Sequence, residues 1–204
     1  RQLSILAVEP SIPARQKTEA AAFRFGVEAA PLFLGFALWI AEQAVAERLD
    51  RVFFLTREGE FFRRIYEIIF PDQILFGHQL PAYAELEVSR LSTFVASMEE
   101  VSNDEFNRIW RLNRSQKVSG LFSTLGLECA DFADLLSEVG LEASDVIERP
   151  DENESLSKLI RAPAFTAAVN KKILEQRELL NEYLTEKGIS QKEKVGLVDI
   201  GWRG

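Results

Sequence analysis

The stretch RVFFLTREGEFFRRIYEIIF, residues 51–70, decides the fold class. Its residues 52–55 form a continuous apolar run, which is typical of a strand buried on both faces in a parallel sheet. A short polar segment around Gly59 follows, and apolar residues then recur at helical spacing until Pro71, which cannot continue a helix. A strand, a tight turn and a helix in this order predict one unit of an α/β fold.

Two more strands are predicted farther along the chain. Residues 83–88 alternate between apolar and polar side chains, which is the period-two pattern of a strand. The closing stretch KVGLVDIGWRG, residues 194–204, repeats the first pattern, because a predicted strand at 195–199 leads into a glycine-bearing turn. These elements predict a three-layer α/β fold with a mostly parallel sheet, Rossmann-like or phosphoribosyltransferase-like in type.

The rest of the chain divides into ranges that differ in their predicted secondary structure. Two early prolines oppose a helix, and the middle of the chain shows several short helical patterns and no convincing strand. The chain starts with Arg1 and not with methionine, so we expect a piece of a longer protein with neighbouring domains. The predicted ranges are an extended lead-in at 1–22, the first part of the α/β domain at 23–98, a helical insertion at 99–162, and the remainder of the α/β domain at 163–204, truncated at Gly204.

The most apolar stretch is AAPLFLGFALWIA, residues 29–41. It is shorter than the about 20 residues that a bilayer-spanning helix needs, so no membrane span is predicted. Proline suits the first turn of a helix, which predicts a helix from about Pro31 to about Arg48. Because apolar side chains occur nearly all round this helix, we expect it to be buried between layers.

Charge and cysteine content restrict the partners and the compartment. The formal net charge of -8 opposes nonspecific binding to nucleic acid, whose phosphates attract a basic surface. Residues 99–162 hold 14 acidic and 7 basic side chains, which predicts either a solvated helical surface or a docking surface for a basic partner. The single cysteine, Cys129, excludes an intrachain disulfide and fits a reducing, cytoplasmic compartment. We interpret it as a small buried hydrophobic residue.

Three turns at predicted strand ends carry side chains suited to an anionic ligand. Ligands of open α/β sheets bind beyond the carboxyl ends of the strands. Arg57 and Arg203 can each hold a phosphate with two parallel hydrogen bonds, and Gly59 permits a tight turn. Asp199 can hold a sugar hydroxyl or Mg²⁺, and Trp202 can stack on a ring. The predicted ligand-binding residues are Thr56, Arg57, Glu58, Gly59, Ser89, Arg90, Asp199, Gly201, Trp202 and Arg203. The alternative is that these turns only connect elements.

Several familiar motifs are absent from the sequence. No G-x-G-x-x-G follows a strand and no G-x-x-x-x-G-K-[ST] occurs, so dinucleotide and P-loop binding have no support. The only histidine, His78, excludes a multi-histidine metal site and weakens a Ser/His/Asp hydrolase interpretation. No catalytic residue is therefore predicted.

Four segments together resemble a known family: FGVEAAPLFLGFALWI, RVFFLTREGEFF, EVSRLS and VGLVDIGWRG. They resemble a region of large bacterial proteins that are identified as haloacid-dehalogenase (HAD) superfamily hydrolases or polysaccharide-biosynthesis proteins, many of them joined to glycosyltransferase domains. The family's turn typically reads F-L-(A/S)-R-D-G and its last motif V-D-x-G-W-x-G-(T/S), and Glu58 stands here where Asp is commoner. The matching residues are Arg57, Gly59, Ser89, Arg90, Asp199, Gly201, Trp202 and Gly204. The resemblance covers residues 23–98 and 194–204 and does not extend to the helical insertion.

The resemblance implies a domain of cell-surface polysaccharide biosynthesis that binds a phosphorylated sugar or nucleotide. Hydrolases of that superfamily act through an Asp-x-Asp pair, and this chain contains no such pair, so it is not by itself a phosphatase of that type. A weaker similarity to phosphoribosyltransferases implies a pyrophosphate at the first turn. Their second loop normally starts with two adjacent acids, whereas Asp199 is followed by Ile200. The remaining alternative is a noncatalytic module that docks a partner through its acidic insertion.

Overall fold

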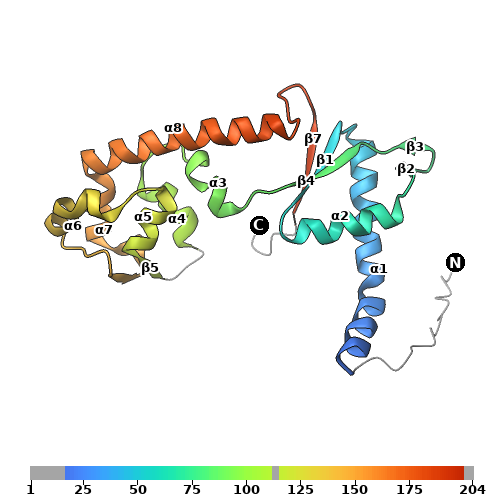
Figure 1. The fold of residues 1–204 in the computed structure, drawn as a ribbon, viewed down its shortest axis with the longest axis horizontal. Coiled ribbons are helices and arrows are strands. Elements are labelled where there is room, and N and C mark those ends of the chain that lie inside the picture. The colour runs from blue at the N-terminus through green and yellow to red at the C-terminus, as the bar shows by residue number, and fades with distance from the viewer. Residues whose placement is uncertain (1–16, 112–114, 200–204) are drawn as a thin grey trace. The chain divides into compact units, whose positions relative to one another are not determined.

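The computed structural model describes residues 17–111 and 115–199, which fold into two compact units (Figure 1). The first, here called the α/β unit, comprises the described residues up to Glu85 and from Glu193 onward. The second, the helical unit, comprises Leu86–Lys192. The chain is therefore mixed α/β, and each unit is described by itself.

The α/β unit contains the predicted parallel sheet. Its three strands are β1 (Arg51–Leu55), β4 (Ala82–Leu86) and β7 (Val195–Val198), in the spatial order β4-β1-β7. β1 and β7 pair in parallel, with Arg51 opposite Val195 and Phe54 opposite Val198. The three predicted strands are thus confirmed, although residues 87–88 and 199 lie outside them.

Lys194 fixes the register of β1 and β7 at their amino ends. Its backbone N–H donates to Asp50 Oδ2 over 2.7 Å, and the Asp50 N–H donates to the Lys194 carbonyl over 2.8 Å. The Lys194 ammonium also bonds the Glu47 carboxylate over 2.6 Å, which lowers the pKa of Glu47. These reciprocal bonds join two segments that are far apart in the sequence.

One layer of helices covers the sheet. Buried side chains of α1 (Lys17–Ala46) and α2 (Glu58–Ile69) join Val52, Phe54 and Val198 in one hydrophobic cluster, which identifies the covered face. On the other face, Leu197 lies opposite Phe53 in register and is 59% exposed, whereas Phe53 is fully buried and the Arg51 guanidinium lies over its ring. The third layer of the predicted fold is not part of the described α/β unit.

Helix α1 differs from the sequence-based expectation at its amino end. Residues 17–22 are helical and not an extended lead-in, and Pro31 lies inside the helix and not in its first turn. The segment before Pro31 is rich in alanine, the strongest helix former, so the flanking turns tolerate the one hydrogen bond that proline removes. Residues 1–16 lie outside the described part of the chain.

Helix α1 is also less buried than expected. Ala37, Ile40, Ala41 and Ala44 enter the core, but Leu32 on the same helix is 72% exposed. The segment Ala20–Ala46 is long and apolar enough to span a membrane, and only 22% of its most apolar window is buried. Core helices of soluble proteins and signal sequences meet the same length and composition requirement, so this helix alone does not assign the chain to a membrane.

A small hairpin connects α2 to β4. β2 (Ile74–Leu75) and β3 (His78–Gln79) pair antiparallel. The turn between them contains Phe76 and Gly77, both with positive φ, and the sequence analysis did not predict these strands. His78 is exposed on this hairpin.

The helical unit has its own hydrophobic core. Its helices are α3 (Arg90–Ser97), α4 (Asn103–Trp110), α5 (Val118–Leu125), η1 (Cys129–Phe132), α6 (Ala133–Val139), η2 (Pro150–Glu152), α7 (Glu154–Arg161) and α8 (Pro163–Glu186). The Ser102 hydroxyl accepts from the Glu105 N–H at the start of α4, and Gly140 ends α6 at φ 73°. The unit also holds a two-stranded antiparallel sheet of β5 (Ser115–Lys117) and β6 (Val146–Glu148), which the sequence analysis missed.

The helical unit is larger than the predicted insertion at 99–162 because α3 and α8 belong to it. Phe165, Val169 and Ile173 of α8 lie in its core, and α8 packs along α3 (Figure 1). Arg177 of α8 donates from Nε to the Ala96 carbonyl over 2.8 Å and from Nη2 to the Met98 carbonyl. Most of the range 163–204, which the sequence assigned to the α/β domain, therefore belongs to the helical unit.

Candidate functional site

The first candidate site lies at the carboxyl edge of the sheet, where β1 and β7 end side by side. Phe54 pairs with Val198, so Asp199 leaves the sheet level with the last residue of β1. The segment 56–59 follows β1 directly and enters α2, and it includes a cis peptide bond between Thr56 and Arg57. Parallel pairing thus brings two of the predicted turns to one edge of the sheet.

The strand order gives this edge a second property. Along the chain the order is β1, β4, β7, but in space β1 lies between the other two. The chain therefore leaves β1 toward one side, through α2, and returns later on the other side of β1. Such a reversal is a topological switch point, beside which open α/β sheets bind their ligands. The switch point of this sheet falls between β1 and β7.

Three charged side chains stand at this edge without charged partners in the described structure. Arg57, Glu58 and Asp199 are exposed, and none of them forms an ion pair or a side-chain hydrogen bond with another described residue. Arg57 and Glu58 therefore do not neutralise each other. Their charges remain open to solvent and to a ligand.

The start of α2 adds backbone donors to the edge. Arg57 is the N-cap, and no side chain caps the helix, so the first amide N–H groups of α2 lack an acceptor from a capping residue. The positive end of the helix dipole favours an anion here. The negative charges of Glu58 and Glu60 in the first turn repel an anion, although the charge of Glu60 is paired with Arg64. Arg57 and the amides are thus the anion-binding groups of this edge.

Gly59 has a packing role that differs from the turn role predicted for it. It lies inside α2, is buried, and is not among the described glycines with positive φ. A Cβ atom at this position would lie 2.7 Å from the Phe54 carbonyl carbon and 3.1 Å from Phe54 Cβ. Gly59 therefore lets the start of α2 approach the backbone of β1, which holds the amides of α2 at the sheet edge.

Ser89 and Arg90 belong to the helical unit. The Ser89 hydroxyl accepts from the Ser92 N–H over 3.1 Å, and the Ser92 hydroxyl accepts from the Ser89 N–H over 2.8 Å, so Ser89 forms a capping box at the start of α3. Ser89 thus has a structural role here. The Arg90 side chain and the predicted residues Gly201, Trp202 and Arg203 lie outside the described part of the structure.

Asp199 offers one carboxylate to a cation. Within residues 17–111 and 115–199, no group of three His, Cys, Asp or Glu side chains comes together as a metal site. Mg²⁺ often takes one or two carboxylates and completes its shell with water and ligand phosphates. Asp199 can supply one such carboxylate. The Mg²⁺ ion therefore stays a prediction, and it requires a phosphorylated ligand that completes the coordination.

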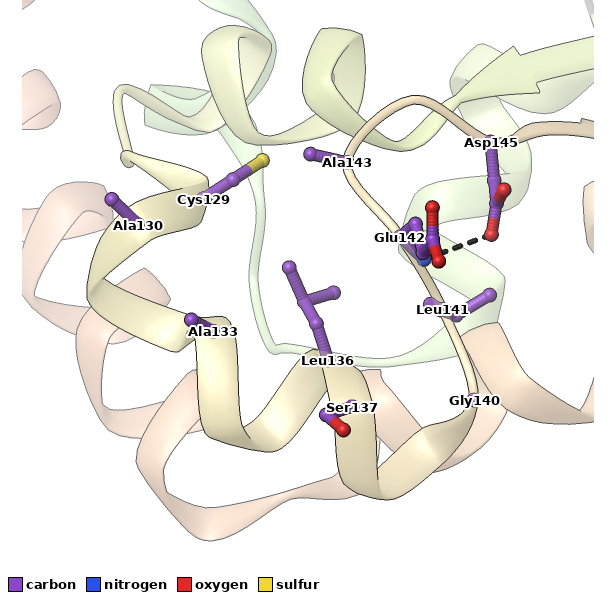
Figure 2. A pocket seen from close by; sticks show the side chains of 10 residues that line it. All are labelled: Cys129, Ala130, Ala133, Leu136, Ser137, Gly140, Leu141, Glu142, Ala143 and Asp145. Atoms are coloured by element: carbon purple, nitrogen blue, oxygen red, sulfur yellow. Dashed lines mark hydrogen bonds between the residues drawn. The ribbon is translucent and has the colours of Figure 1, made fainter.

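A second candidate lies in the helical unit and is a hollow between η1, α6 and the loop after α6 (Figure 2). Its volume is about 820 Å³. In Figure 2, Leu136 points into the hollow, and Cys129 and Ala143 face each other across it. The Asp145 carboxylate accepts from the Glu142 N–H over 2.8 Å, which holds one wall in place. We call this feature the α6 hollow.

Cys129, predicted to be a small buried hydrophobic residue, is only partly buried, and no sequence pattern predicted the α6 hollow. Burial and the neighbouring Glu128 raise the pKa of the Cys129 thiol, so it stays protonated and is not an activated nucleophile. The available signal was a run of small residues, Ala130, Ala133 and Ala143, on segments that also carry core leucines. Small side chains leave space, but only the folded arrangement shows that the spaces coincide.

No protein-family model and no curated protein matches this chain. The resemblance to HAD-superfamily and polysaccharide-biosynthesis proteins therefore stays a prediction from the four quoted segments.

Proposed function

We propose that the α/β unit binds a phosphorylated sugar or a nucleotide at the carboxyl edge between β1 and β7. The observation that supports this most is the β1–β7 register, which sets Asp199 level with the end of β1, two residues before Arg57 at the uncapped start of α2. Arg57 and the α2 amides hold the phosphate, and Asp199 holds a sugar hydroxyl or an Mg²⁺ ion that the phosphate also binds.

The proposed fold around this site is a three-layer α/β sandwich of the Rossmann or phosphoribosyltransferase type. The strand reversal between β1 and β7 supports it, because chain segments on the two sides of a switch point cover opposite faces. The exposed Leu197 also supports it, since a further layer on that face of the sheet would bury its apolar side chain. The role in polysaccharide biosynthesis rests on the sequence resemblance, and we propose binding and not a chemical step.

Ligand-induced thermal stabilisation tests the proposal. The ligands are inorganic phosphate, nucleotide sugars and phosphoribosyl pyrophosphate, each with and without Mg²⁺. A ligand at 100 times its dissociation constant stabilises the native state by about 2.7 kcal/mol, which is well above detection. We expect at least one phosphorylated sugar compound to raise the melting temperature of the α/β unit.

Two pairs of variants locate the binding. Arg57→Ala and Asp199→Ala should each weaken the ligand about 10-fold to 100-fold, because a hydrogen bond to a charged group contributes about 1.5–3 kcal/mol. Arg24→Ala and Asp72→Ala remove exposed charges of the same types elsewhere in the α/β unit and should leave the affinity unchanged. A melting temperature that none of these ligands raises, or equal losses in all four variants, would contradict the proposed site.

A further inference from the structure

The α6 hollow combines an apolar interior with two acidic side chains in its lining, Glu142 and Asp145. Leu136 and Leu141 form its floor, and both also belong to the buried core of the helical unit. Alanine side chains and Gly140 form much of its wall, so the opening is lined by small groups. An apolar side chain that enters here would bury its surface against the core leucines, at about 25 cal/mol per Å².

The segment around the hollow carries negative charge without compensation. Residues 118–148 contain seven acidic side chains and no lysine or arginine. Glu142 and Asp145 line the hollow, and four more of these acids lie on the elements that form it: Glu128, Asp131, Asp134 and Glu138. Within the described structure, none of these six forms an ion pair, whereas other acidic residues such as Glu105 and Glu175 do. This surface therefore repels anions and attracts cations.

Small charged ligands do not explain this combination. Across the described residues, no three carboxylates come together as a metal site, so these acids are too dispersed to chelate one ion. A phosphate or nucleotide would meet repulsion from Glu142 and Asp145, which are the charged side chains of the lining. An extended partner with several separated cations matches dispersed carboxylates, and an apolar anchor matches the leucine floor.

We propose that the α6 hollow docks a basic, amphipathic peptide segment of a protein partner. One bulky apolar side chain of the segment enters the hollow against Leu136 and Leu141, and lysine or arginine side chains beside it meet Glu138, Glu142 and Asp145. This arrangement is that of a small interface with a buried apolar centre and a charged rim. The proposal is independent of the ligand site in the α/β unit, since all its residues belong to the helical unit.

A random 12-residue peptide library, selected on the full chain, tests the sequence preference of the surface. We expect enriched peptides that carry net positive charge and at least one leucine, phenylalanine or tryptophan. The counter-selection uses Ala133→Phe, which fills the hollow without a change of charge. Peptides that are acidic, that lack an apolar anchor, or that bind this variant as well as the wild type overturn the proposal.

Cys129 gives a direct reading of occupancy, because it is the only cysteine and it lines the hollow. A saturating selected peptide should slow the reaction of the Cys129 thiol with iodoacetamide at least fivefold. The same peptide with its apolar anchor changed to serine should protect much less. Equal protection by both peptides would mean adsorption by charge alone and would overturn the docking proposal.

A matched pair of double variants separates this surface from general acidity. Glu138→Gln with Glu142→Gln should weaken the selected peptide about tenfold, and added salt should weaken the wild-type complex in the same direction, because screening reduces the attraction between exposed charges. Glu178→Gln with Glu182→Gln removes the same charge from α8 of the same unit and should leave the affinity unchanged. Equal weakening by the two pairs would overturn the proposal. Thermal unfolding confirms that each variant is folded.

Discussion

The two units differ in how completely they bury their apolar side chains. In the helical unit, one cluster of 19 buried residues draws on α3 through α8. In the α/β unit the corresponding cluster has 12 residues. Among the described residues, 15 large hydrophobic side chains are exposed, and 11 of these belong to the α/β unit. The helical unit is therefore closed around its own core, whereas the α/β unit leaves apolar surface on α1, α2 and β7 without cover in the described structure.

The difference indicates that a closed core and the candidate ligand site belong to different units of the chain. A closed core gives a unit its own cooperative stability, because burial of apolar surface is the main favourable contribution to folding. A site at a sheet edge needs only the local register and the approach of one helix. We therefore expect changes in one unit to act mainly on that unit, and the following predictions test this expectation.

The largest effects should come from core phenylalanines. Phe122→Ala should destabilise the helical unit by about 3–5 kcal/mol, because it removes a buried ring and leaves a cavity. Phe122 is fully buried and contacts Phe165 and Phe132. Phe54→Ala should have a similar effect on the α/β unit. Native-state hydrogen exchange, read by segment, measures each unit separately.

Phe122→Ala should lower protection within residues 86–192 and leave α2 and β1 unchanged. A uniform loss of protection in both units would show one cooperative body and would remove the distinction drawn here.

A smaller effect is expected from the arginine that ties α8 to α3. Arg177→Ala should cost the helical unit about 1.5–3 kcal/mol, because two carbonyl groups lose charge-assisted hydrogen bonds. Lys171→Ala on the same helix is the control, since its ammonium is exposed and should contribute less than about 0.5 kcal/mol. Urea denaturation measures both values. An effect of Arg177→Ala no larger than the control would show that α8 is held by its apolar side chains alone.

A substitution at Gly59 should change the stability of the α/β unit by a similar amount. Gly59→Ala should destabilise this unit by about 1–3 kcal/mol, because its Cβ would overlap the Phe54 backbone. Gly35→Ala is a matched control within a helix of the same unit, where a Cβ meets nothing within 4 Å. It should stabilise α1 by about 0.5–1 kcal/mol, since alanine is the better helix former. The same sign for both substitutions in thermal unfolding would disprove the packing role of Gly59.

The smallest effect is expected at Tyr66. Its ring is fully buried, and its hydroxyl has no hydrogen-bond partner in the described structure. Tyr66→Phe removes an unsatisfied polar group and should stabilise the α/β unit by about 1 kcal/mol at neutral pH. Chemical denaturation of the two proteins gives this difference, and a destabilised phenylalanine variant would mean that the hydroxyl is satisfied.

The same tyrosine predicts a dependence on alkaline pH. Burial, and then the nearby Tyr83, raises the pKa of Tyr66 from 10.0 to about 12. Below the unfolded-state pKa the phenol is neutral in both the folded and the unfolded state, so its ionisation gives the free energy of unfolding no dependence on pH. Above that pKa only the unfolded chain releases the proton, and stability should fall by about 1.4 kcal/mol per pH unit until the folded pKa is reached. The difference between wild type and Tyr66→Phe should therefore be constant below pH 10 and grow above it.

Sequence patterns predicted the elements that have a strong period of their own. The apolar run at 52–55, the helical spacing that follows it and the apolar run before Asp199 became β1, α2 and β7. Short strands such as β5 and β6 were missed, because three residues carry no readable period and pair only when the core beside them has formed. The exposure of α1 was also missed, since an apolar sequence shows what should be buried but not whether anything buries it.

The candidate sites divide in the same way. The sequence by itself determined that Arg57 and Asp199 follow apolar strands, because that property is local and depends on order along the chain. The tertiary structure alone set the pairing of β7 with β1 across 139 intervening residues, which brings these two side chains to one edge. It also decided that Ser89 caps a helix, that Gly59 fits α2 against β1, and that the small side chains of 129–143 enclose one hollow. These outcomes depend on contacts between residues distant in sequence, and no local pattern encodes which distant partner a strand or a helix will meet.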